Sequence, residues 1–357
     1  MNNTFLFPSF SENSRDLLEQ LKPSLEVYSQ IFLICDTHTK EFCLPFFEDN
    51  LSHFVVIELN YGEAYKNLDS CNFVWQKLID YHADRKSVIL NLGGGVVGDL
   101  GGFAAACFKR GIDFIQIPTT LLAMVDACLG GKPGVDFFQH KNQIGVFQQP
   151  VGIYICQQFL QTLPHRELLA GFAEILKHYL IADAQELELF LVDTRPLALR
   201  INRSLIEKAL LIKTSFVIQD PHDENVRKAL NFGHTIGHGL ESAMLHTQEE
   251  LLHGEAVAAG IVAEAFISYR RNFLSWVELQ RITQFVLEYF YFPPSIFDAR
   301  SALLHFIRHD KKNIDREIRF VLLNGFGNYQ LDVAIGEEDI QEAIDYLYEG
   351  IRNRSNA

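Results

Sequence analysis

The pattern of hydrophobic and polar residues divides the chain into two parts of different character. In the first part, short and almost continuously apolar runs alternate with segments in which apolar residues follow helical spacing. Continuous apolar runs are typical of parallel strands that are covered on both faces. The alternation therefore predicts an open, mostly parallel sheet with helices between its strands. The predicted strands are 31–35, 54–58, 87–92, 113–117 and 152–156, and the clearest helices between them are 63–81 and 99–108.

After about residue 165 the apolar residues recur at intervals of three and four, which predicts helices. Pro164 follows the last early strand and marks the expected junction. A length of 357 residues suits about two domains, so we expect an α/β domain over 1–165 and a helical domain over 166–357. A cleft between two such domains is the expected active site. The predicted helices are 167–180, 204–219, 231–244, 253–270, 276–290 and 337–351, and one β-like run, 318–323, interrupts them.

The composition is that of a folded protein, since 48% of the residues are hydrophobic and 21% are charged. The longest strictly apolar stretches, such as 103–108, are far shorter than the roughly 20 residues of a membrane span. The first residues lack the basic and apolar blocks of a secretory signal, so we expect a cytoplasmic protein. The net charge of −14 argues against broad attraction to nucleic acid or anionic membranes, but it allows a local basic pocket.

Six cysteines all lie before residue 157, and no two of them form a C-x-x-C pair. Several lie in apolar runs, as reduced core cysteines do. We therefore expect free thiols rather than a disulfide framework at Cys35, Cys43, Cys71, Cys107, Cys128 and Cys156.

A glycine-rich segment, NLGGGVVGDLGG, starts where the predicted strand 87–92 ends and continues into a helix. Gly93, Gly95 and Gly98 match G-x-G-x-x-G, in which the missing side chains let backbone N–H groups approach a pyrophosphate near a helix N-terminus. The pattern alone is also compatible with a tight structural turn. Its strand–loop–helix context favours nucleotide binding.

A second glycine-bearing segment, PTTLLAMVDACLGGKPGV, spans residues 118–135. Its threonines can cap a helix or donate to a ribose or phosphate, and Asp126 and Lys132 flank a backbone that a ligand can approach closely. Each such residue alone is more often a surface residue. Basic side chains are nevertheless concentrated near these motifs, and they suit a small substrate that carries phosphate and carboxylate groups. They are Arg110, Lys132, Lys141, Lys177, Lys213 and Arg227.

Three histidine-bearing segments lie in the predicted helical part: AGFAEILKH, NFGHTIGHGLES and LLHGEAVAAG. Imidazole nitrogens with a carboxylate oxygen and an open position are typical of a catalytic divalent-metal site, most naturally zinc. Any one of these histidines could instead be a hydrogen-bonded core or surface residue. The spacing places His234 and His238 on one face of a helix, but it does not decide which histidines bind the metal. The candidate groups are Glu174, Lys177, His178, His234, His238, His253 and Glu255.

A nucleotide loop, a metal site and anion-binding side chains together indicate redox chemistry on a phosphorylated polyol. The motifs resemble those of the 3-dehydroquinate synthase family. The resemblance extends from about Tyr61 to Gly327 in the family's order and spacing, whereas the first 60 residues match only loosely. It is carried by GGGVVGDLGGF, RGIDFIQIPTTLLAMVDACLGGKPGV, HKNQIGVFQQP, AGFAEILKH, NFGHTIGHGLE, HGEAVAAG and DKKNIDREIRFVLL.

The resemblance implies a Rossmann-like α/β N-terminal domain that binds NAD, followed by an all-α C-terminal metal-binding domain, with the active site in the interdomain cleft. The family performs the second step of the shikimate pathway, which converts 3-deoxy-D-arabino-heptulosonate 7-phosphate into 3-dehydroquinate and phosphate. The implied route is transient oxidation by NAD, β-elimination of phosphate, re-reduction and intramolecular aldol closure. Zinc or cobalt would act as a Lewis acid on the hydroxyl that is oxidised. A homodimer is also implied.

The resemblance assigns roles to individual residues. It implies that Glu174, His234 and His253 are the metal ligands, which makes His238 a substrate contact. The catalytic residues it implies are Asp126, Lys132, Asn142, Lys177 and His238. The substrate contacts are Arg110, Lys132, Lys141, Asn142, Lys213, Arg227, Asn231, His238 and Lys311 or Lys312, and Arg110 is expected at a dimer interface. The NAD contacts are Asp36, Glu63, Lys66, Gly94, Gly95, Val96, Val97, Gly98, Asp99, Thr119, Thr120, Lys132, Lys141, Phe159, Thr162 and Glu167.

This sequence departs from the family's usual residues at four positions. Pro133 and Asp136 replace threonine and asparagine, His140 replaces a frequent glycine, and His38 replaces a frequent asparagine. None of these changes removes a charged group that the chemistry needs. Pro133 does stiffen the loop that carries Lys132 and removes one N–H donor, so affinity for cofactor or substrate could differ.

Three alternatives use related architecture. A sugar-phosphate cyclase that makes a cyclitol acts on a substrate without a carboxylate, and it has less need of Lys213 and Arg227, which are both present here. A metal-dependent polyol dehydrogenase releases NADH and has no use for so many anion-binding groups. An inactive NAD-binding protein would have lost a ligand or a lysine, and none is missing.

Overall fold

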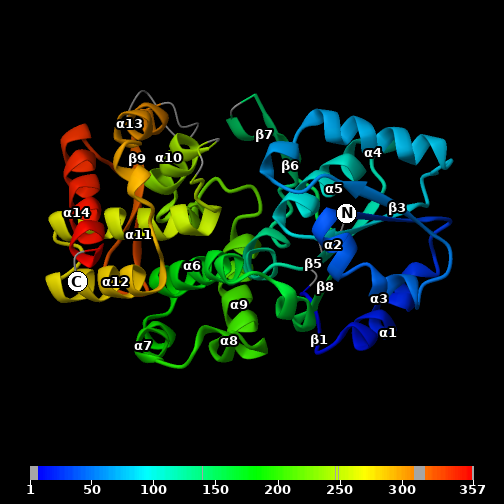
Figure 1. Ribbon diagram of the computed structural model, residues 1–357, viewed down its shortest axis with the longest axis horizontal. Helices are drawn as coiled ribbons and strands as arrows, with labels where there is room; N and C mark the ends of the chain where they lie inside the picture. The colour runs from blue at the N-terminus through cyan, green and yellow to red at the C-terminus, as the bar shows by residue number, and fades with distance from the viewer. Residues whose placement is uncertain (1–6, 139, 246, 248, 309–317, 356–357) are drawn as a thin grey trace. The chain divides into compact units, whose positions relative to one another are not determined.

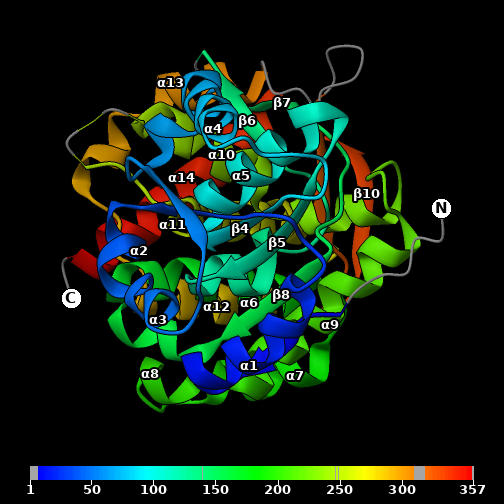
Figure 2. The ribbon, with the colours of Figure 1, turned by 90° about the vertical axis from the view of Figure 1, so that its right-hand side faces the viewer.

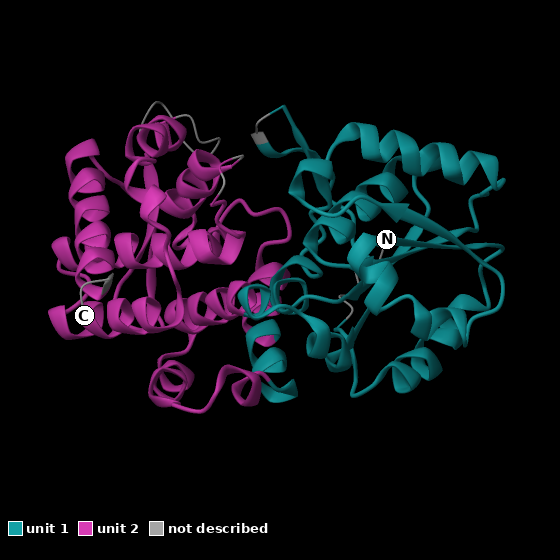
Figure 3. Ribbon diagram, in the orientation of Figure 1, with its two compact units in different colours: residues 1–168, 202–210 teal, residues 169–201, 211–357 magenta. Residues whose placement is uncertain are grey.

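The structure is a computed structural model, in which residues 7–138, 140–245, 247, 249–308 and 318–355 are described (Figure 1). It divides into two compact units: residues 1–168 with 202–210, and residues 169–201 with 211–357 (Figure 3). We expected the domain boundary between residues 165 and 166, and the first unit extends to Leu168. The short segment 202–210 returns to the first unit. The helices α6 (His165–Ala182) and α9 (Arg203–Gln219) therefore each run through a boundary.

The first unit is built on a six-stranded sheet in which every pair of neighbouring strands is parallel, in the order β1-β8-β5-β4-β2-β3. All five predicted strands are confirmed, and their ends differ from the prediction by at most one residue. The structure adds the edge strand β1, whose three residues are too few to give a pattern. The strands are β1 (Ser9–Ser11), β2 (Ile31–Asp36), β3 (Phe54–Leu59), β4 (Val88–Gly93), β5 (Asp113–Pro118) and β8 (Gly152–Cys156).

The apolar strand sequences reflect burial on both faces of this sheet, and every residue of β4 is buried. On one face pack α4 (Leu68–Asp80) and α5 (Gly95–Cys107), from which Leu78, Val97 and Phe103 share a core with Phe32 and Ile89 of the strands. On the other side lie α1 (Ser14–Leu25) and α3 (Pro45–Glu48), while α2 (Thr37–Phe42) follows directly on β2 (Figures 1 and 2).

Two predicted helices of this unit have other limits in the structure. The predicted helix 63–81 consists of a 3₁₀ turn, η1 (Glu63–Tyr65), and α4, because the Asn67 side chain accepts the Ser70 N–H and starts a new helix. The predicted helix 99–108 begins four residues earlier, at Gly95, so the glycine-rich segment forms the first turn of α5. Helices α1, α2 and α3 were not predicted by range, and neither were the antiparallel hairpin β6 (Gly134–Phe137) and β7 (His140–Gly145), the 3₁₀ helices η2 (Phe108–Arg110) and η4 (Gln157–Thr162), and the π-helical turn η3 (Ala123–Ala127).

The second unit is helical, as predicted. All six predicted helices of this part of the chain form, and the β-like run 318–323 forms β9 (Arg319–Leu323), which pairs antiparallel with β10 (Tyr329–Ala334). The predicted helix 231–244 starts later, because residues 226–231 form the 3₁₀ helix η5 (Val226–Asn231). The other elements are α7 (Ala184–Val192), α8 (Leu197–Arg200), α10 (His234–Met244), α11 (His253–Arg270), α12 (Trp276–Tyr289), η6 (Pro294–Phe297), α13 (Arg300–Arg308) and α14 (Glu337–Ser355).

Helix α11 is buried along most of its length, because alanine, glycine, valine and isoleucine occupy all of its faces. Its contact with α10 is very close. A Cβ atom on Gly260 would lie 1.9 Å from the Gly233 carbonyl oxygen, and one on Gly237 would lie 3.0 Å from the Ala256 oxygen. Glycine on both helices therefore lets the two backbones touch, and this contact determines where the side chains of α10 lie.

All six cysteines are free thiols, and all except Cys107 are buried. Burial raises the pKa of Cys35 and of Cys43 to about 12, so these thiols stay protonated at neutral pH. In the described part of the chain, none of the helices combines the length and the apolar character that a membrane span requires.

Candidate functional site

The glycine loop of the first unit forms an open helix N-terminus. Gly94 is the N-cap of α5 in extended conformation, and no side chain among the described residues caps this helix. A Cβ on Gly93 would lie 2.6 Å from Val97 Cβ, so packing alone requires glycine there. A Cβ on Gly95 would meet only Ala127 Cβ, at an ordinary 3.5 Å. The space at Gly95 and the uncapped N–H groups fit an approaching phosphate, as a dinucleotide requires.

The two threonines of the second glycine-bearing segment lie beside this loop. The Thr119 N–H donates to the Gly93 oxygen at 3.0 Å, and the Ala123 N–H donates to Thr120 Oγ1 at 3.1 Å. A Cβ on Gly94 would lie 3.1 Å from Thr120 Cγ2, so this threonine also packs on the loop. The structure thus brings together the glycine and threonine residues expected to contact NAD.

Other residues expected to contact NAD have local structural roles. Asp36, at the end of β2, caps α2: its Oδ1 accepts the Thr39 N–H at 2.8 Å. The rings of His38 and Tyr61 lie 4.1 Å apart, centroid to centroid, and the Tyr61 hydroxyl donates to Glu167 Oε1 at 3.2 Å. Phe159 is a buried core residue in η4, where Thr162 Oγ1 donates to the Phe159 oxygen at 3.5 Å.

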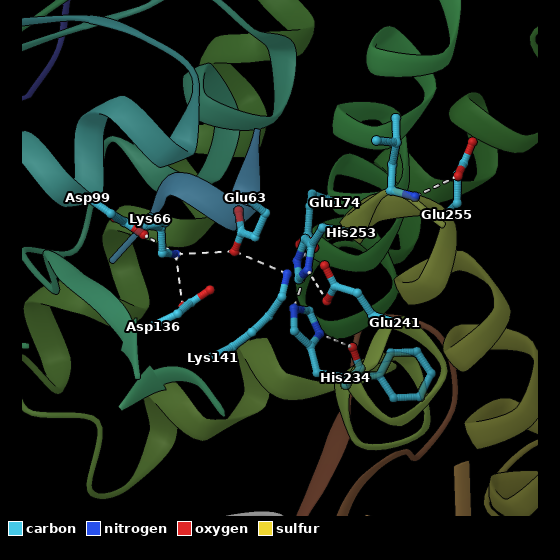
Figure 4. A network of polar contacts seen from close by, with 12 residues as sticks. Glu63, Lys66, Asp99, Asp136, Lys141, Glu174, His234, Glu241, His253 and Glu255 are labelled. Carbon is cyan, nitrogen blue, oxygen red and sulfur yellow. Dashed lines mark hydrogen bonds and ion pairs between the residues drawn. The ribbon is translucent and has the colours of Figure 1, made fainter. Parts of the chain in front are cut away.

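The buried Lys66 lies at the centre of a network of half-buried charged side chains in the same unit (Figure 4). Its Nζ is 3.1 Å from Asp99 Oδ2, 3.5 Å from Glu63 Oε1 and 3.9 Å from Asp136 Oδ1. Lys141 Nζ reaches the same Glu63 oxygen at 3.1 Å. Burial by itself would lower the pKa of Lys66, but the three carboxylates outweigh it and raise that pKa. Lys66 is therefore charged, and four of the expected NAD contacts meet in one network.

Asp136, which stands where the family usually has asparagine, is also a member of this network. Burial raises the pKa of Asp136 although Lys66 opposes the shift. Its Oδ1 accepts the Asn142 N–H at 2.8 Å, and its own N–H donates to the Lys66 oxygen at 2.8 Å. Asn142 has φ 52°, a left-handed conformation that this bond helps to hold. Asp136 thus ties the hairpin that carries Lys141 and Asn142 to Lys66.

The other expected site residues of the first unit lie on turns. Arg110 is exposed at the end of η2 with φ 69°, and Asp126 is half-buried in η3. Lys132 is exposed directly after Gly130 and Gly131, which both have positive φ. Glycine is required there because this backbone conformation is left-handed.

In the second unit, three proposed ligands converge on one point (Figure 4). Oε1 of the fully buried Glu174 lies 3.5 Å from His234 Nε2 and 3.4 Å from His253 Nε2. Each residue comes from a different helix: Glu174 from α6, His234 from the start of α10 and His253 from the start of α11. Zinc bonds of about 2.0–2.2 Å at tetrahedral angles separate ligand atoms by about 3.4 Å. Both oxygen–nitrogen separations therefore match the separation between two ligands of one divalent ion.

Both histidines direct Nε2 to this point because Nδ1 has another partner. His253 Nδ1 lies 3.2 Å from Glu241 Oε2, and His234 Nδ1 lies 3.1 Å from the Phe232 oxygen. With the proton on Nδ1, each ring donates to its oxygen and keeps the Nε2 lone pair for a metal. Burial alone would lower the pKa of His253, but Glu241 and Glu174 raise it to about 10. The surrounding negative charge therefore favours a cation.

His238 lies one helical turn after His234, and its ring centroid is 5.1 Å from that of His234 and 5.7 Å from that of His253. Nitrogen atoms of the three imidazoles all lie within 4.8 Å of one another. His238 therefore faces the same point and can contact a ligand of the ion or the ion itself. Glu255, another candidate, instead accepts the Leu252 N–H at 2.8 Å and caps α11.

Three basic residues of the second unit, Lys177, Lys213 and Arg227, are buried rather than solvated. Lys177 contacts Glu174 on the same turn of α6, and Lys213 is also buried. Arg227 donates from Nη1 to the Pro221 oxygen at 3.0 Å, and its N–H donates to Asp220 Oδ2 at 3.1 Å. A buried cation needs a specific reason, and binding an anion is one. His178 is buried on α6, Asn231 is half-buried at the end of η5, and Lys311 and Lys312 lie outside the described residues.

Solved structures with a similar fold indicate the structural class of this chain. It superposes on 2-deoxy-scyllo-inosose synthase complexed with carbaglucose-6-phosphate, NAD+ and Co2+, with a TM-score of 0.82 and 25% identity over 94% of this chain and 95% of that one. A glycerol dehydrogenase from Schizosaccharomyces pombe, 15% identical with a TM-score of 0.64 over 98% and 92% of the two chains, shares the fold. The architecture is therefore that of sugar-phosphate cyclases and polyol dehydrogenases.

Sequence comparison identifies the family within this structural class. The model for the 3-dehydroquinate synthase N-terminal region matches residues 56–170, and the model for its C-terminal region matches residues 171–313. A 3-dehydroquinate synthase of Parabacteroides distasonis is 38% identical over 342 residues, which are 94% of each chain. One of Citrifermentans bemidjiense is 40% identical over 287 residues, 78% of this chain and 77% of the relative. The chain belongs to the 3-dehydroquinate synthase family, as its motifs indicate.

Proposed function

We propose that this chain converts 3-deoxy-D-arabino-heptulosonate 7-phosphate into 3-dehydroquinate and phosphate. The observation that carries the proposal is the position of Glu174 Oε1, which lies at the separation of two ligands of one tetrahedral divalent ion from Nε2 of His234 and from Nε2 of His253. Family membership and the open glycine loop support the same reaction. When bound, NAD supplies reversible oxidation of a hydroxyl, and zinc or cobalt supplies Lewis acidity toward that hydroxyl.

The first unit would hold the dinucleotide. The N–H groups at the start of α5 face the pyrophosphate, and the missing side chain of Gly95 gives it room. Lys66 stays charged among its carboxylates and keeps that network rigid beside the hairpin. The full set of proposed NAD contacts is Asp36, Glu63, Lys66, Gly94, Gly95, Val96, Val97, Gly98, Asp99, Thr119, Thr120, Lys132, Lys141, Phe159, Thr162 and Glu167.

The second unit would hold the substrate hydroxyls and its carboxylate. His238 faces the proposed ligands and orients the reacting hydroxyl or moves its proton. Lys213 and Arg227 are buried cations that suit the carboxylate, and Asn231 follows on the same 3₁₀ helix as Arg227. Lys177 balances the charge of Glu174.

The turn and hairpin residues of the first unit would bind the phosphate and remaining hydroxyls. Lys132 and Asn142 suit the phosphate, together with Lys311 or Lys312, while Lys141 suits the hydroxyls and Asp126 a further polar contact. Asp136 holds Asn142 through its backbone N–H, which gives this exposed residue a defined place. Since proximity and orientation can supply roughly 7–11 kcal/mol, positioning by these side chains accounts for much of the proposed rate enhancement.

The proposed reaction needs residues of both units, since the expected NAD contacts lie in the first unit and the proposed metal ligands in the second. From the resemblance to the 3-dehydroquinate synthase family we also infer that the protein is a homodimer with Arg110 at its interface. We infer as well that it acts in the cytoplasm. Size-exclusion chromatography with light scattering of the native chain and of Arg110→Ala tests the dimer.

The reaction is tested by incubating the pure protein with 3-deoxy-D-arabino-heptulosonate 7-phosphate, trace NAD and zinc while inorganic phosphate and absorbance at 340 nm are followed. We expect many turnovers of phosphate release without accumulation of NADH, abolished by a chelator and restored by zinc. His253→Ala should remove the activity, whereas His305→Ala, on the exposed face of α13, should not.

Two results would contradict the proposal in distinguishable ways. NADH that accumulates in step with substrate loss identifies a polyol dehydrogenase instead. Turnover of sedoheptulose 7-phosphate, with none of the carboxylated substrate, identifies a cyclitol synthase and removes the carboxylate-binding role of Lys213 and Arg227.

A further inference from the structure

Glu264 is a buried carboxylate that has no part in the chemistry proposed above. It lies in the middle of α11 with 0% of its surface exposed. Its Oε2 accepts the Gly233 N–H at 2.7 Å, and its Oε1 accepts the Ile236 N–H at 3.0 Å. Both oxygens therefore have donors from another helix, which compensates the loss of water around a buried charge.

Those two N–H groups belong to the first turn of α10. Gly233 is the N-cap of this helix and Ile236 is its third residue. Glycine has no side chain with which to accept an N–H of the first turn, and such groups need an acceptor when they are buried. Glu264 supplies the acceptor from α11, and its carboxyl group lies at the positive end of the α10 dipole.

Close packing of the two helices brings the carboxylate to this position. Gly260 lies one turn before Glu264 on α11, and a Cβ there would be 1.9 Å from the Gly233 oxygen. Gly233 has φ 78°, and a Cβ on it would be 2.7 Å from Ile261 Cγ1. A side chain on either glycine would push α10 away from α11. The two hydrogen bonds of Glu264 therefore depend on a backbone contact that is defined by steric fit.

We propose that Glu264 is a positioning residue of the metal site, an inference that rests on the proposed ligands Glu174, His234 and His253. His234 is the first residue of α10, and it lies between the two residues whose N–H groups Glu264 accepts. The place of its imidazole follows the place of this turn. His238, one turn further along, moves with the same helix.

The two helices orient each other's ligand. Glu241 of α10 lies 3.2 Å from Nδ1 of His253, which is on α11. Glu264 of α11 holds the turn that carries His234 on α10. Each helix thus contributes one proposed ligand and one carboxylate that positions the ligand of the other. A shift between the helices would alter both Nε2 positions at once, so metal affinity is the property most sensitive to Glu264.

The proposal is tested on the full-length protein after removal of metal. Glu264→Gln keeps the size of the side chain but turns one acceptor oxygen into an NH₂ group that faces an N–H donor. We expect the dissociation constant for Zn²⁺, measured by competition with a chromophoric chelator, to rise by about 10- to 100-fold. The visible absorption of the Co²⁺-loaded variant should also change, because it reports the geometry of the ligands. Glu264→Asp keeps both acceptor oxygens and should lose less affinity.

Ser275→Ala is the matched control, because it removes the N-cap of α12 in the same unit, away from the proposed ligands. It should lower the Tm of the apoprotein while zinc affinity stays within about twofold of the native value. A Glu264→Gln protein that loses Tm in the same way but keeps its zinc affinity and its Co²⁺ spectrum would make Glu264 a helix cap only, and would overturn the proposal. If the Glu264→Gln protein does not fold, a zinc affinity of Glu264→Asp equal to that of the native protein would also overturn the proposal.

The proposed ligand set is tested separately by His253→Ala. Loss of zinc binding in that variant together with native affinity in Glu264→Gln rejects the positioning role and leaves the ligands in place. Undiminished zinc binding in His253→Ala rejects the ligand set itself, and the positioning role falls with it.

Discussion

Gly260→Ala tests the claim that backbone contact between α10 and α11 determines the metal site. The new Cβ would lie 1.9 Å from the Gly233 carbonyl oxygen, which is 1.1 Å inside the 3.0 Å below which Cβ atoms essentially never approach. The atom that it meets belongs to the backbone, so no side-chain rotation can relieve the clash. The two helices must separate locally by about 1 Å or more.

The magnitude follows from two opposing terms. Overpacking in a close-packed interior costs typically 1–3 kcal/mol, and a clash with backbone belongs at the upper end, about 3 kcal/mol. Alanine in place of glycine in a helix gains about 1 kcal/mol. The net loss is about 2 kcal/mol, which for a unit of this size corresponds to a fall of about 4–8 °C in Tm. Separation of the helices should also weaken zinc binding by about tenfold or more, since it moves His234 relative to His253.

The assay is thermal unfolding of the apoprotein followed by a zinc titration against a competing chelator. Gly350→Ala is the matched control, because Gly350 is also helical, in α14, and its Cβ would meet side-chain atoms and no backbone, with Leu287 Cδ1 at 3.1 Å and Thr283 Cγ2 at 3.9 Å. That variant should be as stable as the native chain or slightly more stable. If Gly260→Ala has the same Tm and zinc affinity as Gly350→Ala, the helix contact does not determine the site and the reasoning is wrong.

Three further substitutions test other parts of the structure. Gly95→Ala should weaken NAD binding, measured by calorimetry, by about tenfold while stability is kept, because its Cβ has only one ordinary contact, at 3.5 Å, within the described protein. Asp136→Asn should raise the free energy of unfolding in urea at pH 7, because burial raises the pKa of Asp136 and its negative charge therefore opposes folding above that pKa. This gain in stability should disappear as the pH falls toward 3.8, the ordinary pKa of the group, where Asp136 is protonated in both states. Arg200→Lys should lower the free energy of unfolding by about 2–4 kcal/mol, because the buried guanidinium donates to Tyr289 Oη and lies 4.7 Å from the Phe172 ring centroid.

Each of these predictions has a result that contradicts it. Unchanged NAD affinity in Gly95→Ala would mean that no ligand approaches this glycine. An Asp136→Asn chain that is less stable at pH 7 would mean that attraction to Lys66 outweighs the cost of burial. For Arg200, Arg195→Lys is the control, because Arg195 is an exposed partner of Asp193 and its replacement should change stability by less than about 1 kcal/mol.

The local elements could be predicted from the sequence because their signals are local. Continuous apolar runs mark the strands of a sheet covered on both faces, and residues 31–36 or 113–118 show this without any tertiary information. Helix α11 coincides with its predicted limits for the same reason. The hairpin β6–β7 was missed because its strands are short and polar, and its pairing depends on contacts such as the Asp136 N–H to Lys66, far away in the chain.

The candidate site was predictable in part. The glycine loop is contiguous in sequence, so its helix N-terminus could be inferred directly. The proposed metal ligands follow from the family motifs, because spacing alone leaves His234, His238 and His253 equivalent. Glu241 and Asp136 have no signal of this kind, since their partners are given by the fold.

The sequence by itself determined the parallel sheet, the helical second half, the glycine loop and the family to which the chain belongs, because each follows from residues that are neighbours or that repeat with a fixed period. Only the tertiary structure decided which carboxylate contacts which histidine, as Glu241 contacts Nδ1 of His253. Glu264 reads in sequence as one more polar residue of an alanine-rich helix, and it becomes a buried cap of α10 only because Gly233 and Gly260 let two backbones touch. A metal site depends on distances of a few ångströms between separate helices, and those distances are determined by packing.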